Sequence, residues 1–419
     1  MASDKDYKIT LQDKEISFTL TSLAEQANGK ILVRMGDTVV LVTAVMSRYP
    51  LDNLSFFPLT VEYEERFYAA GKILGSRYMR REGRPSDEAV ITARVIDRAI
   101  RPLFPEGFNR EVQVICTVLS WDAKNDPDLM GLMGASLALS TSNIPFAGPV
   151  GVIRIGRIDG NFILNPTYEQ REKSDLDFVL AATKKDGEVL FSMIEAEGRE
   201  VPEEIFQEAL EFGEPFLGEI IEFQEKIAKE QGKEKILFEA PGSDVELVRE
   251  CKEFIGDKLK EVLFFGEKKS RMDAANDLKA ELAYYIDGKY PGEGKSSPAK
   301  DYFESEINRL IHKAALNEGA RVDGRKLNEL REISGEVNLL PRTHGSGFFT
   351  RELTKTLSLL TLGAPGDHRL LEGMEFIGKK RFMHHYNFPP YAPGEVKPMR
   401  GPGRREIGHG KLAWRAIKP

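Results

Sequence analysis

The sequence contains few residues of the kinds that define several classes of protein. There are 2 cysteines and 6 histidines in 419 residues. Cys116 and Cys251 lie far apart without the spacing of a zinc site, so a cysteine metal site and a disulfide framework are excluded and two buried thiols in a reducing compartment are expected. No apolar run approaches the roughly 20 residues that cross a bilayer. The N-terminus has charged residues in place of the apolar stretch of a secretory signal, so we expect a cytoplasmic protein.

The sequence also lacks an excess of positive charge. Its 59 basic residues face 66 acidic ones, which gives a net charge of -7. The field of the whole molecule therefore does not attract nucleic acid, and any site for a polyanion must be a local basic patch. Hydrophobic residues at 41% and charged residues at 30% are ordinary for a soluble globular protein. The length predicts two or three domains.

Secondary-structure signals predict an α+β region at the start of the chain. Short runs rich in β-branched residues alternate with turn signals, and 30–45 is predicted to form two strands joined by a tight turn at 35–37. Ser86 precedes acidic residues and an apolar helical pattern, which predicts a capped helix. A second helix, rich in Gly, Ala and Leu, is predicted over 129–141. These elements predict a first domain over residues 1–200.

Strand signals disappear between residues 201 and 320. Apolar residues recur there at helical spacing in several segments, and Pro215 marks a kink or a break. This pattern predicts an all-helical domain over 201–320.

The chain repeats itself at an offset of about 320 residues. Four blocks recur in the same order: 34–38 with 351–354, Tyr63 and Gly71 with Tyr386 and Gly394, 80–82 with 404–406, and 98–102 with 415–419. We therefore predict a duplicated α+β domain, with the second copy over residues 321–419. Because that copy stops at the residue that matches Pro102, we expect the chain to be a truncated product or a fragment.

The strongest local signal is an arginine-rich segment at 77–84. It contains one tyrosine and four arginines: Tyr78, Arg77, Arg80, Arg81 and Arg84. Guanidinium groups match phosphate geometry with paired hydrogen bonds, and an adjacent ring can stack on a base. We expect this segment to form a loop that contacts a polyanion, and a solvated charged surface is the alternative.

A second basic segment lies at 400–411. Its glycines, at positions 401, 403, 408 and 410, are expected to let the backbone approach a ligand. The candidate donors to phosphate oxygens are Arg404, Arg405, His409 and Lys411. For His409 a structural cap is the alternative. The sequence contains no Gly-x4-Gly-Lys-Ser/Thr loop, His-Glu-x-x-His, Gly-x-Ser-x-Gly or Gly-x-Gly-x-x-Gly motif.

Two further groups favour structural roles. Asp122, Asp126 and Asp128 resemble part of a calcium loop, but the glycine and the distal glutamate of such a loop are missing, so a turn and a helix cap are expected. His384 and His385 lie in a strand-like run, where we expect one core and one surface residue.

Several blocks together resemble the bacterial polynucleotide phosphorylase family. They are distributed over nearly the whole chain: 67–73, 80–86, 97–105, 125–128, 340–345, 385–391 and 402–412. The resemblance implies two RNase PH-like domains flanking an all-helical domain, with the second of them incomplete. It also implies a homotrimeric ring that degrades single-stranded RNA from the 3′ end in mRNA turnover, with inorganic phosphate as co-substrate and nucleoside 5′-diphosphates as products.

Site residues follow from the same resemblance. Those that match the phosphate and RNA contacts of the catalytic copy are Arg404, Arg405 and His409. Those that match the RNA-gripping loop of the non-catalytic copy are Tyr78, Arg80, Arg81 and Arg84. The resemblance implies Mg²⁺ as cofactor, but its aspartate ligands and a phosphate-binding serine pair would lie beyond Pro419. Residues 1–419 alone are therefore expected to show negligible phosphorolysis.

Three residues at two places in the chain depart from the family pattern. Met79 replaces one of two aromatic residues expected before Arg80, and Glu352 and Leu353 occupy a turn where the family usually has Gly-Glu after the arginine. The leading hypothesis is a phosphate-dependent exoribonuclease. A non-catalytic RNA-binding or ring-scaffold fragment and a hydrolytic nuclease of related fold are the alternatives.

Overall fold

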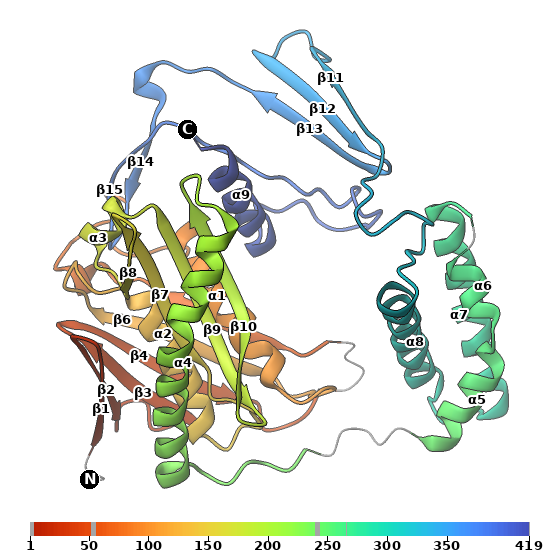
Figure 1. Cartoon of the computed structure of the whole chain (residues 1–419), viewed down its shortest axis with the longest axis horizontal. Coiled ribbons are helices and arrows are strands. Elements are labelled where there is room, and N and C mark those ends of the chain that lie inside the picture. The colour runs from red at the N-terminus through yellow and green to blue at the C-terminus, as the bar shows by residue number, and fades with distance from the viewer. Residues whose placement is uncertain (1–3, 52–55, 239–243, 265, 419) are drawn as a thin grey trace. The chain divides into compact units, whose positions relative to one another are not determined.

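The chain forms two compact units. The computed structural model describes residues 4–51, 56–238, 244–264 and 266–418 (Figure 1). One unit consists of Met1–Ala240 together with Pro365–Pro419, and the other of Pro241–Ala364. The domain boundaries at 200 and 320 remain predictions.

A six-stranded sheet opens the first unit, in the order β1-β2-β3-β4-β6-β5. Its strands are β1 (Lys5–Leu11), β2 (Lys14–Leu20), β3 (Gly29–Met35), β4 (Thr38–Met46), β5 (Leu59–Glu64) and β6 (Val112–Ser120). All neighbours are antiparallel except β5 and β6, which are parallel. The predicted hairpin is confirmed: β3 and β4 pair from Met35 with Thr38 outward, and Gly36 takes the left-handed φ of 60° that the turn requires.

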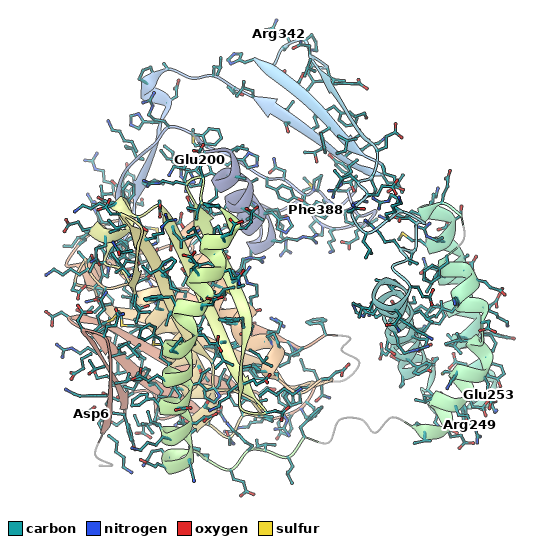
Figure 2. The ribbon with its side chains drawn as sticks, in the orientation of Figure 1. Asp6, Glu200, Arg249, Glu253, Arg342 and Phe388 are labelled. Atoms are coloured by element: carbon teal, nitrogen blue, oxygen red, sulfur yellow. The ribbon has the colours of Figure 1, made fainter. Side chains whose placement is uncertain are left out.

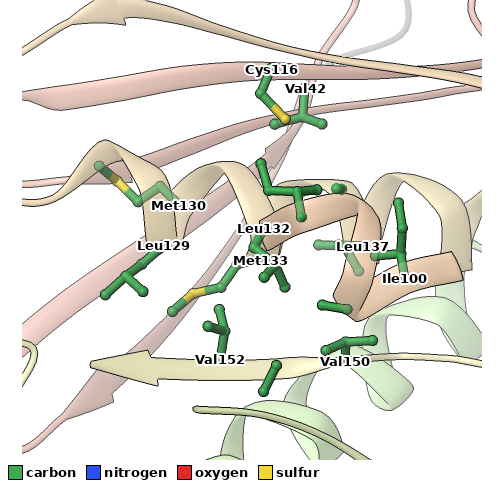
Figure 3. Packing of buried hydrophobic residues seen from close by; sticks show 14 of the residues in the cluster. Val42, Ile100, Cys116, Leu129, Met130, Leu132, Met133, Leu137, Val150 and Val152 are labelled. Carbon is green, nitrogen blue, oxygen red and sulfur yellow. The ribbon is translucent and has the colours of Figure 1, made fainter. Parts of the chain in front are cut away.

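The helix α2 (Pro127–Thr141) lies between this sheet and a second one. The second sheet has the order β10-β9-β7-β8 and consists of β7 (Gly151–Ile158), β8 (Asn161–Leu164), β9 (Leu176–Lys185) and β10 (Glu188–Gly198). Figure 3 shows Leu132 and Met133 of α2 between Val42 on one sheet and Val152 on the other. A Cβ on Gly134 would lie 2.5 Å from a Val42 methyl group, so a small residue is needed for this close packing. The predicted helix rich in Gly, Ala and Leu is thus confirmed as the centre of the core.

Three further helices complete this part of the unit. They are α1 (Asp87–Ile100), α3 (Tyr168–Lys173) and α4 (Glu203–Gln231), with the short 3-10 segments η1 (Phe67–Ala70) and η2 (Arg101–Leu103). Ser86 caps α1, because its hydroxyl accepts a hydrogen bond from the N–H of Ala89 at 2.9 Å. The helix α4 packs against β7 and β9, and it continues through Pro215, where the sequence predicted a kink or a break.

Residues 365–418 form the last part of the same unit. Their elements are η3 (Pro365–Asp367), β14 (Arg369–Glu372), β15 (Ile377–Lys380) and α9 (Arg404–Ile417). Met374, between the two strands, is fully buried in the core of the first copy, and its carbonyl accepts a hydrogen bond from Lys72 at 2.7 Å. The first copy and the segment 365–418 therefore share one hydrophobic core.

The second unit contains a helical part and a small sheet. The helices are α5 (Val245–Ile255), α6 (Lys258–Leu263), α7 (Lys268–Lys289) and α8 (Ser296–Asn317), and the strands are β11 (Ile333–Val337), β12 (Gly345–Arg351) and β13 (Thr354–Leu360). Glu352, in the turn between β12 and β13, has a φ of 56°, which is close to the value at Gly36 in the first copy. Both cysteines are free and buried, as predicted. None of the helices in the described part of the chain combines the length and apolar character needed to span a membrane.

Candidate nucleic-acid interface

The arginine-rich segment 77–84 forms a loop between η1 and α1, as the sequence predicted. The carbonyl of Ser76 accepts hydrogen bonds from the N–H groups of Met79 and Arg80 at 3.0 and 2.8 Å. Gly75 has a φ of 98°, and a Cβ there would lie 2.5 Å from the carbonyl oxygen of Arg81. The chain can therefore close on itself only with glycine at this position.

Glu82 fixes the base of this loop. Its carboxylate accepts a hydrogen bond from the N–H of Phe67 at 2.8 Å and lies 3.9 Å from Arg66. Burial alone would raise the pKa of Glu82, but backbone hydrogen bonds and the charges of Arg66 and Arg81 hold that pKa below its usual value. The single acid of the loop is thus held at the base by Phe67 and Arg66, and of the four loop arginines the charge of Arg81 acts on it.

The loop presents its cations to solvent. Tyr78 is 92% exposed, and the guanidinium groups of Arg77, Arg80, Arg81 and Arg84 belong to exposed residues. Across the described residues, none of these four arginines lies within ion-pair distance of a carboxylate. Four unpaired guanidinium groups and one exposed ring are therefore available to a polyanion.

The second basic segment differs from the prediction. Gly408 and Gly410 were expected to let the backbone approach a ligand, but they lie inside α9, whose first residue is Arg404. A Cβ on Gly408 would lie 2.6 Å from the Nε atom of Arg94 in α1, and one on Gly410 would lie 3.5 Å from the Cβ atom of Tyr386. These glycines let α9 pack closely against its neighbours, and they do not open the backbone to a ligand.

Helix geometry gives Arg404 and Arg405 different environments. Arg404 points toward β5, where its Nη1 atom donates to the carbonyl of Val61 at 2.6 Å and its Nη2 atom forms an ion pair with Glu62. Arg405 is exposed, and its guanidinium lies 4.7 Å from the ring centroid of Phe388. Figure 2 labels Phe388 close to α9. Of the two predicted arginines, Arg405 is the one that faces solvent beside an aromatic ring.

His409 lies one helical turn beyond Arg405. It is exposed, and its ring centroid is 5.3 Å from that of Tyr386. Tyr386 in turn stacks on Phe388 at 6.2 Å with nearly parallel planes, 9° apart. Arg405 and His409 therefore present their nitrogen donors on one face of α9. The rings of Phe388 and Tyr386 pack against these two side chains. We call this surface the Arg405–His409 face.

The two arginine clusters lie near each other within the first unit. A Cβ on Gly401, just before α9, would lie 3.9 Å from the Nη1 atom of Arg84. The structure therefore brings the 77–84 loop and the segment that leads into α9 side by side, although more than 300 residues separate them in the sequence.

His384 and His385 lie on a different surface. His384 is half-buried and His385 is exposed, and the described residues around them, 381–388, contain no strand. Both line a cavity beside α1 and α9. Other residues that line this cavity are Asp87, Glu88, Arg369, Lys380, Lys411 and Trp414.

Three carboxyl groups form a cluster that the sequence did not reveal. Burial raises the pKa of Asp128 to about 7, and the nearby charge of Glu375 acts in the same direction. Burial also raises the pKa of Glu375 to about 7, with Glu65 adding to the effect. Burial raises the pKa of Glu65 as well, and its carboxylate accepts a hydrogen bond from Ser86 at 2.6 Å. Glu375 belongs to no motif, so only the fold could place it beside Asp128.

The predicted cap and turn at 122–128 are confirmed. The side chain of Asp126 accepts from the N–H of Asp128 at the start of α2 and pairs with Arg154, while Asp122 accepts from the N–H groups of Lys124 and Asn125. Among the residues that the structure describes, no three His, Cys, Asp or Glu side chains gather to hold a metal ion.

Sequence comparisons identify the family. The profile of the 3′ exoribonuclease family, domain 1 (RNase PH), matches residues 12–145 and 329–419, and the profile of domain 2 of the same family matches residues 148–214. The two matches to domain 1 correspond to the two copies of the internal repeat.

Curated relatives agree with these matches. A polyribonucleotide nucleotidyltransferase of Syntrophomonas wolfei is 46% identical over 413 residues, which cover 99% of this chain and 58% of the relative. One of Finegoldia magna is 47% identical over 418 residues, which cover 99% of this chain and 57% of the relative. The crystal structure of rice Rrp46 covers 54% of this chain and 94% of its own, with 14% identity and a TM-score of 0.41.

The chain thus spans less than two thirds of the length of the curated relatives that it matches. Within that span it carries both profiles of the family, two RNase PH-like copies and helices between them. The chain therefore belongs to the 3′ exoribonuclease family of RNase PH-like proteins.

Proposed function

We propose that this chain supplies the arginine part of the active site of a phosphate-dependent 3′-to-5′ exoribonuclease, which releases nucleoside 5′-diphosphates from RNA. The observation that carries the proposal is the Arg405–His409 face, where two exposed donors lie over the rings of Phe388 and Tyr386. The polyribonucleotide nucleotidyltransferases to which the chain is similar bear the name of this activity.

The chemistry explains why exposed arginine is needed. Inorganic phosphate must approach a phosphodiester that carries charge of the same sign, and two such charges ~4 Å apart repel by several kcal/mol at an effective dielectric constant near 20. The guanidinium of Arg405 offers paired donors that suit phosphate oxygens. One ring nitrogen of His409 can donate a further hydrogen bond. An oxygen of inorganic phosphate then attacks the phosphorus of the last phosphodiester of the RNA. The bond from that phosphorus to the 3′ oxygen of the preceding nucleotide breaks.

The loop at 77–84 is suited to holding the RNA strand. Its unpaired arginines can follow successive phosphates, and the exposed ring of Tyr78 can stack on a base. The proximity of Arg84 to Gly401 supports one continuous track from this loop to α9. Arg80, Arg81, Arg84 and Tyr78 are therefore proposed as RNA contacts, and Arg405 and His409 as catalytic residues. Arg404 is proposed to act with them from the start of α9, where it contacts β5.

The family resemblance adds further parts to the proposal for the whole protein. They are Mg²⁺ as cofactor, a homotrimeric ring, a role in mRNA degradation and a cytoplasmic location. The domains are proposed as 1–200, 201–320 and 321–419. No step of the reaction is assigned to Mg²⁺.

Product analysis tests the proposal. The whole protein is incubated with single-stranded RNA and Mg²⁺, with and without inorganic phosphate, and the nucleotides are separated by ion-exchange chromatography. We expect nucleoside diphosphates that form only when phosphate is present. Monophosphates formed without phosphate would show a hydrolytic nuclease, and RNA binding without products would show a non-catalytic RNA-binding or scaffold protein. Either of these results would overturn the proposal.

A further inference from the structure

Three cations of α9 lie on one side of the helix. Arg404, Lys411 and Arg415 are separated by seven and four residues. At about 100° per residue, these positions fall within roughly 20° of one line along the helix. Arg405 and His409 lie about 100° to 140° away from that line, on the Arg405–His409 face. The helix thus has two basic faces with different surroundings.

Each of the three cations meets a carboxylate of the first copy. Arg404 pairs with Glu62 of β5, Lys411 lies 2.6 Å from Glu88 of α1, and Arg415 lies 2.6 Å from Glu195 of β10. The three carboxylates belong to different elements, so their alignment is a product of the fold. We call these contacts the three-carboxylate ladder.

Glu195 pairs with two arginines, and one of them, Arg415, also lies 3.2 Å from Glu197 of β10. One oxygen of Glu195 lies 2.6 Å from Arg415, and the other lies 2.6 Å from Arg98 of α1. Arg98 and Arg415 are matching positions of the internal repeat. The side chains of Arg415 and Glu195 are 20% and 25% exposed, which is less than for the Lys411–Glu88 pair, where Glu88 is 61% exposed. Partial burial makes such a pair less sensitive to screening than a surface pair.

Packing on the same side of α9 agrees with this arrangement. Gly408 lies about 40° from the line of the three cations, where its missing side chain makes room for Arg94 of α1. The helices α1 and α9, which occupy matching positions in the repeat, pack directly against each other (Figure 1). The three ion pairs and the close packing at Gly408 therefore lie on the same side of α9, the side that contacts the first copy.

We propose that Glu195 is a positioning residue, and that the three-carboxylate ladder docks α9 on the first copy so that the Arg405–His409 face is held toward the ligand. In this arrangement the copy that the family resemblance describes as non-catalytic has a second role besides gripping RNA. It sets the rotation of the helix that carries the proposed catalytic donors. The docking of α9 is inferred from these contacts alone, whereas its effect on RNA binding depends on the proposed function.

Hydrogen exchange tests the docking directly. Glu195→Gln keeps the size of the side chain and removes its charge. We expect amide exchange in peptides from 404–417 to become about threefold to tenfold faster, with the rest of the chain unchanged. The matched control is Glu222→Gln, which breaks an exposed pair with Lys184 outside α9. Unchanged exchange in 404–417, or equal acceleration throughout the chain, would overturn the proposal.

A double-mutant cycle tests the positioning role. The affinity of the 419-residue chain for a fluorescent single-stranded RNA is measured for Glu195→Gln, Arg405→Ala and the double variant. Since Glu195 is proposed to act through the Arg405–His409 face, its effect should largely vanish once Arg405 is absent. Additive effects in the cycle would show that Glu195 does not position this face. If the unmodified chain binds no RNA, the proposed function fails, while the exchange experiment still decides the docking.

Discussion

At the scale of single residues, α9 separates two neighbours that the sequence presents as equivalent. Arg404 and Arg405 occupy the same motif, but one turns toward Glu62 and the other toward Phe388. A guanidinium engaged by a carboxylate and a carbonyl has fewer free donors for phosphate. Replacement of Arg405 should therefore affect ligand binding more directly than replacement of Arg404.

The first prediction concerns this difference. In the whole protein, Arg405→Ala removes an exposed donor to the phosphate groups, so turnover at saturating RNA should fall on the order of 100-fold, by analogy with the loss of one oxyanion donor. Arg404→Ala should also lower turnover, and in addition it should weaken the docking of α9 on β5. Steady-state kinetics with saturating RNA and phosphate measure both effects. Arg309→Ala, in an exposed ion pair of α8, is the control. Turnover within a factor of a few of the unmodified protein would remove Arg405 from the catalytic set.

The second prediction concerns the carboxyl cluster. Burial raises the pKa values of Asp128 and Glu375 in the folded chain, and the charge of Glu375 adds to the effect at Asp128, as that of Glu65 does at Glu375. Between about pH 4.5 and pH 7 the folded chain therefore binds more protons than the unfolded chain. In that window the free energy of unfolding should fall as the pH rises, and the stability that the protons provide should be lost above about pH 7.

Glu375→Gln tests this linkage, because an amide cannot ionise. The groups that act on Asp128 and Glu375 include Tyr63 of β5, Arg154 of β7, Tyr168 and Arg171 of α3, and Glu65, and the substitution leaves all of them in place. Between pH 5 and pH 8, we expect the free energy of unfolding of the variant to fall by about 1–3 kcal/mol less than that of the unmodified chain. Urea unfolding at the two pH values measures the difference. Equal losses in both proteins would show that Glu375 does not titrate in this range.

At the scale of elements, the loop at 77–84 and the helix α9 show what the sequence could predict. The cap of α1 by Ser86, the turn at Gly36 and the cap of α2 by Asp126 depend on a few neighbouring residues, and all three were predicted correctly. The helix α9 was not predicted. Its glycines Gly408 and Gly410 were expected to open the backbone to a ligand, because their packing partners are not visible in the sequence. Only the fold places Arg94 and Tyr386 against these glycines.

Charge pairs between distant elements were equally hidden. Glu62, Glu88 and Glu195 lie in ordinary strand and helix patterns, and nothing local links them to Arg404, Lys411 or Arg415. The arginine-rich loop, by contrast, was recognised because its chemistry is concentrated in eight consecutive residues. Its role in RNA binding stays a prediction.

The third prediction tests that role. Each phosphate that a cation neutralises on a single strand contributes roughly -0.7 to the slope of log K against log salt concentration. Replacement of Arg80, Arg81 and Arg84 with alanine should therefore flatten the slope by up to about two units, because these side chains have no carboxylate partner in the described structure. Binding titrations of long single-stranded RNA at several salt concentrations measure this slope.

Substrate length provides the control for the loop. A dinucleotide is too short to span the loop and α9 together, so the triple variant should cleave it nearly as well as the unmodified whole protein does. A long RNA should be degraded more slowly. An unchanged salt slope with long RNA would mean that the loop is solvated surface.

At the scale of the whole molecule, the first copy and the segment after residue 365 form one unit, with Met374 in the shared core and α9 docked on α1. The duplication therefore produces one composite surface, to which one copy contributes the 77–84 loop and the other contributes the Arg405–His409 face. We expect RNA to contact both.

The most direct test is nuclear magnetic resonance of the side-chain nitrogens in the 419-residue chain during titration with RNA. With a long single-stranded RNA, the resonances of Arg405, His409 and the arginines of the 77–84 loop should shift together, while that of Arg404, held by Glu62, should shift least. With a dinucleotide, only Arg405 and His409 should shift. Shifts at Arg404 without shifts at Arg405, or no shifts at either cluster, would contradict the account.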